Sequence, residues 1–490
     1  MRKIMKSVKQ IKKFENKPLQ IFRVPKEGDF VYMGQRPNAF PLREQLDIVN
    51  DGIIYSAGNG ICAKIFNREK LDTYHKNKCI YMTSHKIVDE SICWPVQILS
   101  NEKGEFVGYL FRPYKGYALD YAVFKKAGLD TVFPRWEKKD VVELAITILD
   151  KIEILHKNGV LLGCLDPSSI KIVDSKTVYF TNTDQYQVSD YLCLLRNQFF
   201  IPPERIDYMD KNFLFSNRTE NYLLAVLIFL ILMTGKAPYV TRNGKKGVES
   251  IKNMQFPYAY KEHHSKGVPD GVWRFMWSHL YFKLKEAFYE TFQAGECRNQ
   301  PADRYDEDFW LSCLKEYHQK LTSGEYCRHD RNSALLFPET FRKVKNEKYI
   351  KCVNCNKEFP VWFMDRELGN ICKSCCEKIS EEYFVCVDCG RKFYYSVKEK
   401  MCHITYNWNE QKHCPECKRK TICKKCGKEY EAYKLKNGCC KECNKGNVYD
   451  IIRCKSCGRN FEFYYSEKDF YDEMNYDYPQ KCKECRKKKR

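Results

Sequence analysis

The sequence lacks any hydrophobic run close to the roughly 20 apolar residues that a helix needs to cross a bilayer. Its longest apolar stretch, Tyr222 to Met233, reaches about half to two thirds of that length and is typical of a buried core helix. The basic N-terminus also lacks the apolar segment of a secretory signal. We therefore expect a cytoplasmic protein that makes no contact with membranes.

Acidic residues are in the minority. The chain has 84 Lys+Arg against 63 Asp+Glu, which gives a formal net charge of +21. Hydrophobic residues make up 43% of its 490 residues, enough for packed cores, and this excludes a disordered polyelectrolyte. The length predicts roughly two to four domains. The basic balance makes nucleic acid a candidate partner.

Cysteine, by contrast, is abundant, with 27 residues. Without an export signal these are expected to be thiols or metal ligands rather than disulfides. The cysteines within residues 1–330 are scattered, and we interpret them as small buried side chains. Most of the cysteines between Cys352 and Cys485 instead form C-x-x-C pairs.

The C-x-x-C pairs form four groups along the chain. Two such turns can place four thiolates tetrahedrally around one zinc ion, so we predict about four structural Zn²⁺ ions. Glycine follows three of the turns, where a left-handed backbone is often needed. The predicted zinc ligands are Cys352, Cys355, Cys372 and Cys375, then Cys386, Cys389, Cys414 and Cys417, then Cys423, Cys426, Cys440 and Cys443, and finally Cys454, Cys457, Cys482 and Cys485.

The second and fourth groups repeat one another, and the last reads C-K-S-C-G-R-N-F followed by K-C-K-E-C-R-K-K-K. This pattern resembles the bacterial probable zinc-ribbon family. The resemblance implies four small zinc ribbons, the last of which ends in a basic tail. We place these ribbons at residues 351–380, 381–420, 421–448 and 449–490.

The first 330 residues change character along their length. Short apolar runs separated by turn residues predict strands at Leu46–Val49, Ile53–Ser56, Ile61–Phe66, Val96–Leu99 and Phe106–Phe111. After Trp136 the apolar residues recur at helical spacing. The sequence therefore predicts an α+β architecture in which a strand-rich part precedes a helical part.

Several short motifs follow this division in a fixed order. They are Gly52, then Cys62-Ala63-Lys64, Cys164-Leu165-Asp166-Pro167-Ser168-Ser169, Asn182, Pro202-Pro203-Glu204, Glu220 and Arg304. Their order and spacing resemble the protein kinase family. The resemblance implies a two-lobed kinase-like fold, with an N-lobe at 45–114 and a C-lobe at 115–322. A basic extension (1–44) would precede it, and a linker (323–350) would join it to the ribbons.

The resemblance also assigns roles to individual residues. Gly52, Ala63 and Lys64 would contact ATP. Glu204, Glu220 and Arg304, which match the family's pattern, would be structural anchors of the C-lobe.

The departures from the family concern its chemistry. Phosphoryl transfer needs a carboxylate to orient the attacking hydroxyl and ligands for Mg²⁺. Cys164 stands at the position of that carboxylate, and Ser169 and Asn182 stand at the metal-binding positions. Uncharged groups hold Mg²⁺ poorly, so ATP binding is possible but Mg²⁺ binding is doubtful. Asp166 and Asp184 could act as substitutes if the backbone shifts.

The helix after the Lys64 strand carries no glutamate in register with that lysine, so Lys64 is expected to lack its usual partner. Three hypotheses follow. The first is a pseudokinase that acts as a scaffold or regulatory module and recruits a protein partner; the resemblance points to phosphatase or von Willebrand A signalling proteins. The second is an active, atypical Ser/Thr protein kinase. The third is a nucleic-acid binder that acts through its basic ribbons.

Overall fold

The computed structural model describes residues 16–34, 39–58, 60–209, 211–242, 247–258, 260, 267–394, 396–406 and 412–487. The chain forms two compact units, Met1–Glu347 and Lys348–Arg490. Each unit is described by itself. No helix in the described ranges is long and apolar enough to cross a membrane.

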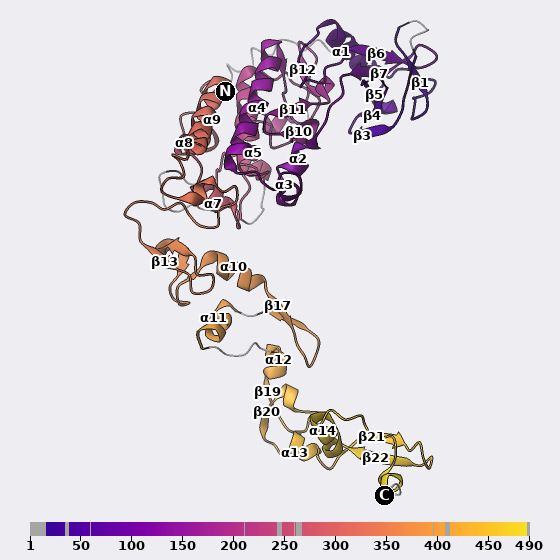
Figure 1. Cartoon of the computed structure of the whole chain (residues 1–490), viewed down its shortest axis with the longest axis vertical. Helices are drawn as coiled ribbons and strands as arrows, with labels where there is room; N and C mark the ends of the chain where they lie inside the picture. The colour runs from indigo at the N-terminus through magenta and orange to yellow at the C-terminus, as the bar shows by residue number, and fades with distance from the viewer. Residues whose placement is uncertain are drawn as a thin grey trace. The chain divides into compact units, whose positions relative to one another are not determined.

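A curled antiparallel sheet opens the first unit (Figure 1). Its strand order is β2-β1-β6-β7-β5-β4-β3. The strands expected from the apolar runs are present as β3, β4, β5, β6 and β7. The strand bounds are β1 Phe30–Tyr32, β2 Ala39–Pro41, β3 Gln45–Val49, β4 Gly52–Ser56, β5 Cys62–Phe66, β6 Gln97–Ser100 and β7 Phe106–Phe111. Helix α1 (Thr73–Ser84) packs beside the sheet, with contacts to β6 and β7.

The segment expected to be a basic N-terminal extension contributes to this sheet instead. Strands β1 and β2 extend it beyond β6, and Ile21, Val31 and Leu42 are buried in its core. Each strand has only three residues, too few to produce a periodic signal in the sequence. Residues 1–15 of the expected extension lie outside the described residues.

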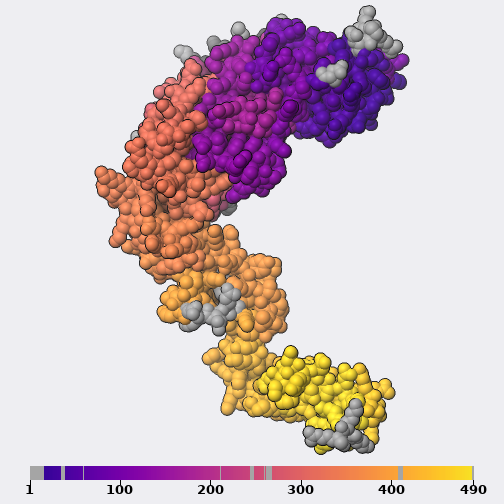
Figure 2. Space-filling view, viewed as in Figure 1, coloured from indigo at the N-terminus to yellow at the C-terminus, as the bar shows by residue number. Residues whose placement is uncertain are grey.

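The rest of the first unit is mainly helical and continues from the sheet as one body (Figure 2). Helix α5 (Asn217–Leu232) is buried along most of its length, as expected for the longest apolar run. The other helices are α2 Leu119–Ala122, α3 Lys126–Val132, α4 Lys138–Lys157, α6 Gly247–Lys252, α7 Trp273–Ser278, α8 Phe282–Phe292 and α9 Glu307–Thr322. Short strands complete it: β8 Tyr117–Ala118, β9 Val160–Leu161, β10 Ile170–Asp174, β11 Thr177–Phe180 and β12 Gln187–Val188.

Most of the segment predicted as a linker packs onto this helical part. Tyr326 and Leu336 join its hydrophobic core, and buried Ser333 lies 3.0 Å from a ring nitrogen of His279. The first unit extends to Glu347 for this reason. Isolated apolar residues in a polar segment give no periodic pattern, so the sequence did not indicate this packing.

The second unit is a series of small modules, each built from a strand pair and short helices. Its strands are β13 Tyr349–Lys351, β14 Glu358–Pro360, β15 Met364–Asp365, β16 Ile371–Cys372, β17 Tyr383–Val385, β18 Lys392–Tyr394, β19 Lys420–Ile422, β20 Glu429–Glu431, β21 Val448–Arg453 and β22 Asn460–Tyr464. Its helices are α10 Lys373–Glu381, α11 Val397–Tyr406, α12 Pro415–Lys418, α13 Lys441–Asn444, α14 Tyr465–Glu473 and α15 Lys483–Lys487.

Candidate functional sites

The sixteen paired cysteines of the second unit gather into four clusters of four. Within each cluster all the sulfur atoms lie within 4.8 Å of one another. The Sγ–Sγ distances between Cys389 and Cys414 and between Cys457 and Cys482 are 3.7 and 3.8 Å. Four sulfurs at about 2.3 Å from a tetrahedral zinc ion would be separated by about 3.8 Å. Each cluster is therefore shaped to hold one Zn²⁺ ion, and the protein fits about four structural zinc ions.

The same backbone turn presents the first cysteine pair in every module. The N–H of Cys386 donates to the carbonyl of Arg391, and the N–H of Gly390 donates back to the carbonyl of Cys386, both at 2.9 Å. Gly390, Gly427 and Gly458 have φ values of 69°, 71° and 72°, as predicted, and Asn356 takes this place in the first module with a φ of 58°. A left-handed residue is thus part of each turn.

The second pair of each module lies at the beginning of a helix. Cys372, Cys414 and Cys440 are the N-cap residues of α10, α12 and α13, and Cys482 directly precedes α15. In every module the N–H of this cysteine donates to the first sulfur of the facing turn, at 3.3 Å. Such hydrogen bonds stabilise thiolate character, which zinc requires.

A zinc turn on a strand pair combined with a helix-borne cysteine pair defines the treble clef class of zinc-binding module. A family described as "Probable treble clef domain" matches residues 450–490, the fourth module. None of the curated proteins matches the chain. The second unit is an array of four zinc-binding modules, and helices carry the second ligand pairs that the sequence analysis had placed in ribbons.

A second cluster of charged groups lies in the first unit, around Lys64 of β5. Lys64 is fully buried, and its Nζ lies 2.9 Å from both carboxylate oxygens of Asp184. The same nitrogen lies 2.8 and 3.0 Å from the two oxygens of Asp51. Burial alone would lower the pKa of Lys64, but the two carboxylates overcome this effect and raise it. Lys64 therefore has two ionic partners, whereas the sequence predicted that it lacks one.

Asp51 reaches Lys64 from the turn between β3 and β4. It is 6% exposed. Burial would raise the pKa of its carboxyl group, but the charge and hydrogen bond of Lys64 lower it, so Asp51 is ionised. Asp184 lies on a short 3-10 helix, Thr183–Gln185, and also accepts a 2.6 Å hydrogen bond from the hydroxyl of Tyr109.

The position facing this cluster on α1 is occupied by a lysine. Lys78 is buried, and its Nζ donates to the carbonyl of Leu192 at 3.0 Å. Helix α1 packs against the 3-10 helix Thr183–Gln185 that carries Asp184, so Lys78 acts electrostatically on Asp184 and Lys64. Burial is the main cause that lowers the pKa of Lys78 to about 8. The cluster thus contains two lysines and two aspartates. The sequence analysis missed Asp51, Lys78 and Tyr109; an acidic residue in the turn and a lysine in the helix were the available signals.

The three residues at the predicted catalytic positions are neutral and buried. Burial is the main cause that raises the pKa of the Cys164 thiol to about 12, so the thiol keeps its proton at neutral pH. The hydroxyl of Ser169 donates to the carbonyl of Asp166 at 2.7 Å. Asn182 has a left-handed φ of 54°, and its Oδ1 has no hydrogen-bond partner among the described residues. None of these groups is a strong Mg²⁺ ligand or a general base.

Asp166 has a local structural role. Its carboxylate accepts a 3.0 Å hydrogen bond from the N–H of Ser168 and caps the 3-10 helix Pro167–Ser169. It also borders a hollow of about 440 Å³. The hollow is lined by Asn50, Leu165, Asp166, Leu195, Arg196, Asn197, Gln198, Phe199 and Met209. The two aspartates predicted as substitutes therefore differ: Asp166 borders open space, while Asp184 is tied to Lys64.

The predicted anchors of the helical part make strong internal contacts. Arg304 donates two hydrogen bonds to the carboxylate of Glu204, at 2.9 and 2.7 Å. Glu220 is 1% exposed and accepts the backbone N–H groups of Leu162 and Gly163 at 2.7 and 3.0 Å. Glu220 thereby fixes the loop that carries Cys164 and Ser169.

Gly52 and Ala63 occupy tight positions in the sheet. A Cβ added to Gly52 would lie 2.4 Å from the carbonyl oxygen of Ile65, so any side chain would disturb the pairing of β4 with β5. Ala63 is fully buried between Tyr55 and Leu110 on the neighbouring strands. Their contacts explain why both residues are small, and nucleotide contact by either stays a prediction.

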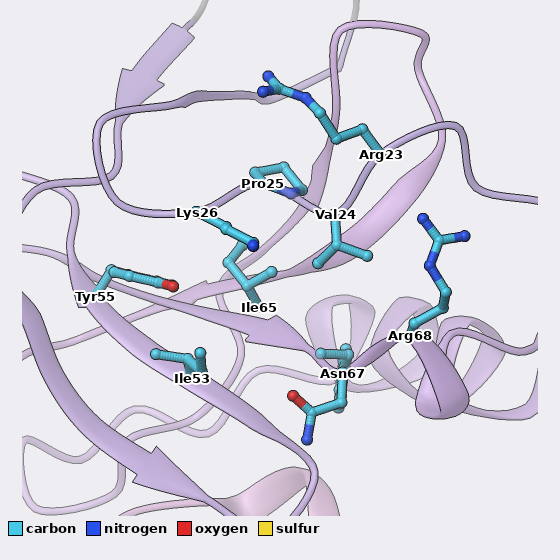
Figure 3. Close-up of a pocket in the computed structure, with 10 residues that line it drawn as sticks. Arg23, Val24, Pro25, Lys26, Ile53, Tyr55, Ile65, Asn67 and Arg68 are labelled. Carbon is cyan, nitrogen blue, oxygen red and sulfur yellow. The ribbon is translucent and has the colours of Figure 1, made fainter.

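A second hollow, of about 430 Å³, lies on the sheet beneath the segment 23–26 (Figure 3). Ile53, Tyr55 and Ile65 line it, together with Arg23 and Arg68. Ile65 directly follows Lys64 on β5, and consecutive strand residues point to opposite faces. This hollow is therefore separate from the lysine–aspartate cluster.

Proposed function

We propose that the first unit is a kinase-like fold that has lost phosphoryl transfer and acts as a scaffold for the zinc-binding array. The strand-rich part, the lysine of β5 and the later Glu204–Arg304 pair support the kinase resemblance. Glu220 supports it as well, because it binds the backbone just before Cys164.

The observation on which this proposal depends is that Cys164, Ser169 and Asn182, at the centre of the predicted site, are neutral and buried. The Cys164 thiol is too weak an acid to serve as a base at neutral pH, and the Ser169 hydroxyl already donates to a carbonyl. Lys64, which would bind phosphate, is saturated by Asp51 and Asp184. A site whose base and metal-binding positions are neutral favours binding or recruitment over transfer.

A transfer assay tests this proposal. The full chain is incubated with labelled ATP, Mg²⁺ or Mn²⁺, and a generic basic protein. We expect no more label on the chain or the substrate than in a heat-denatured control. Metal-dependent transfer would overturn the proposal. Asp184→Asn and Asp166→Asn would then identify the carboxylate in use, with Asp174→Asn, on the exposed end of β10, as the control.

A second candidate function, nucleic-acid binding, is favoured by a cationic segment that runs from the end of the second module into the third. Six basic residues occupy residues 418–428, around β19 and the zinc turn, and most are exposed. None of the six forms an ion pair within the described residues, although Lys425 donates to the carbonyl of Cys443 at 3.3 Å. The five without that bond are Lys418, Arg419, Lys420, Lys424 and Lys428. Unpaired cations on an exposed hairpin suit contacts with a phosphate backbone.

The C-terminal tip is a weaker candidate. Lys483 pairs with Glu467 at 2.9 Å, and Arg486 donates to the hydroxyl of Tyr471. The last three residues of the basic tail, 488–490, lie outside the described residues. We therefore assign the candidate interface to the cationic segment at residues 418–428.

Fluorescence anisotropy with a labelled single-stranded oligonucleotide tests this candidate. Binding should weaken with salt, with a logarithmic slope of about −0.7 for each phosphate contact. The variant Lys420→Gln/Lys424→Gln/Lys428→Gln should reduce that slope. A control with Lys434→Gln and Lys445→Gln removes lysines already paired to Glu431 and Glu442. Equal losses in both variants would contradict a local interface.

A further inference from the structure

The turn between β3 and β4 places a carboxylate against the buried amine of Lys64. Two oxygens of Asp51 lie 2.8 and 3.0 Å from the Nζ atom, the geometry that an anionic oxygen of a ligand would adopt with a lysine. The turn also borders open space, because Asn50 lines the 440 Å³ hollow. Asp51 thus directly follows a residue that lines the hollow, and its carboxylate contacts Lys64.

The charges of the cluster depend on Asp51. With Asp51 in place, the charges of Lys64 and Lys78 are matched by Asp51 and Asp184. If the turn moved out, the two lysines would face Asp184 alone, and the site would carry an excess positive charge. Lys78 donates to a backbone carbonyl and not to a carboxylate, so its charge stays available to an incoming anion.

We propose that Lys64 and Lys78 form a binding site for a phosphate-bearing ligand that needs no divalent cation, and that the Asp51 carboxylate occupies this site as an internal substitute. The ammonium group of Lys78 supplies the positive charge that a metal ion would otherwise provide. Binding and withdrawal of Asp51 are then coupled, since both anions compete for Lys64.

This inference rests on the proposed function and deepens it by naming the ligand class of the lysine–aspartate cluster. The two remain separable, because the inference is tested by binding and the proposed function by phosphate transfer. A chain that binds phosphate ligands without transferring them satisfies both. A chain that transfers phosphate but binds it only with Mg²⁺ would refute both, and the two assays report these results independently.

The experiment uses the full chain and two probes, sodium tripolyphosphate and ATP, in buffer without added divalent cations. No further chelator is added, because chelators remove zinc from modules of this kind. Both probes bind divalent cations themselves, so zinc content is measured after each titration and heat is assigned to the site only where that content is unchanged. Affinity is measured by calorimetry for the wild type, Asp51→Ala and Asp51→Asn. Asp47→Ala is the matched control, because Asp47 lies on β3 and pairs with Lys171 outside the cluster.

We expect Asp51→Ala to bind tripolyphosphate at least about tenfold more tightly than the wild type, within the range usual for coupled sites. Adding Lys78→Met should remove most of that gain. Equal gains for both probes would assign the site to the phosphate chain, and a gain with ATP alone would assign it to a nucleotide.

Three results would overturn the inference. The first is that neither Asp51→Ala nor the shape-conserving Asp51→Asn gains affinity while both remain folded. The second is an equal gain in Asp47→Ala, which would indicate a general charge effect. The third is a gain that requires Mg²⁺ or survives Lys78→Met, either of which would remove the assigned role of Lys78. Should Asp51→Ala fail to fold, Asp51→Asn decides the question alone.

Discussion

Replacing Glu220 by glutamine removes one charge from the most deeply buried anchor of the first unit. One carboxylate oxygen of Glu220 accepts the Leu162 N–H at 2.7 Å and lies 3.2 Å from Nε2 of His156. The other accepts the Gly163 N–H at 3.0 Å. A glutamine side chain has a single carbonyl oxygen, so its amide NH₂ group would face one of these donors.

The expected cost combines two effects. An unpaired buried N–H costs about 1–3 kcal/mol. Breaking a buried charged pair by removing one partner costs about 3–5 kcal/mol in total. We therefore expect Glu220→Gln to lower the free energy of unfolding by about 3–5 kcal/mol, whereas Glu153→Gln, which breaks the exposed pair with Lys157, should cost about 0.5 kcal/mol or less.

The pH dependence gives an independent measure of the same contact. Burial would lower the pKa of His156, but hydrogen bonds to Glu220 and Glu307 raise it from 6.5 to about 9. A raised pKa means that this stabilisation is fully present below pH 6.5 and is lost as pH rises through about 9. The shift corresponds to about 3 kcal/mol. Glu220→Gln should flatten this part of the pH profile.

Urea unfolding followed by tryptophan fluorescence checks both effects, with the wild type, Glu220→Gln and Glu153→Gln measured from pH 6 to pH 10. The difference between variants cancels other groups that titrate in this range. The reasoning would be refuted if Glu220→Gln cost less than about 1 kcal/mol at pH 6.5, the net value of one ordinary hydrogen bond. It would also be refuted if the two variants had the same pH profile.

Three further predictions concern single sites. Elemental analysis should find about four zinc ions per chain, and Cys423→Ser should lower the count by about one; a wild-type count of one or fewer would contradict the four clusters. Gly52→Ala should destabilise the first unit by about 1–3 kcal/mol in urea unfolding, because the added Cβ would meet a backbone carbonyl. Gly446→Ala should be nearly neutral, because no atom lies within 4 Å of the position of its added Cβ. Lys138→Met should stabilise the chain at pH 7 by about 1–4 kcal/mol, because the buried Lys138 amine has no hydrogen-bond partner among the described residues and burial is the main cause that lowers its pKa to about 7. The gain should vanish as the pH rises above 10.5, where the unfolded lysine also becomes neutral. Equal stability of the two proteins at pH 7 would contradict this account.

The zinc centres could be predicted in detail because their determinants are local. A C-x-x-C turn specifies its own geometry, and the left-handed residue after it is visible as glycine in three of four modules. The strands of the sheet and the buried helix α5 were likewise visible in apolar patterns. The helical position of the second cysteine pairs was not, because a helix such as α12, with four residues, leaves no periodic signal.

The lysine–aspartate cluster could not be predicted because its members are distant in the sequence. Lys64 meets Asp184 across 120 residues. The kinase resemblance concerns the positions at which that family carries its catalytic and metal-binding groups. From it we expected Asp184 only as a substitute for a lost carboxylate. It did not show that Asp51, one residue before Gly52, would turn inward.

The departures from the kinase pattern around Lys64 all change the electrostatics of the site in the same direction. Magnesium requires anionic ligands, and Asn182 and Ser169 remove the charge at two of the predicted ligand positions. Lys78 adds a positive charge close to Asp184, which would oppose a cation at that carboxylate. The same lysine would favour an anion, and Asp51 supplies one from within the chain. A lysine–aspartate cluster that disfavours a metal ion and attracts anions agrees with the proposal that the Asp51 carboxylate occupies the position of a phosphate group. On this reasoning Lys78→Glu, which reverses the charge, should place a negative charge close to Asp184 and lower stability, whereas Lys76→Glu on the same helix should not.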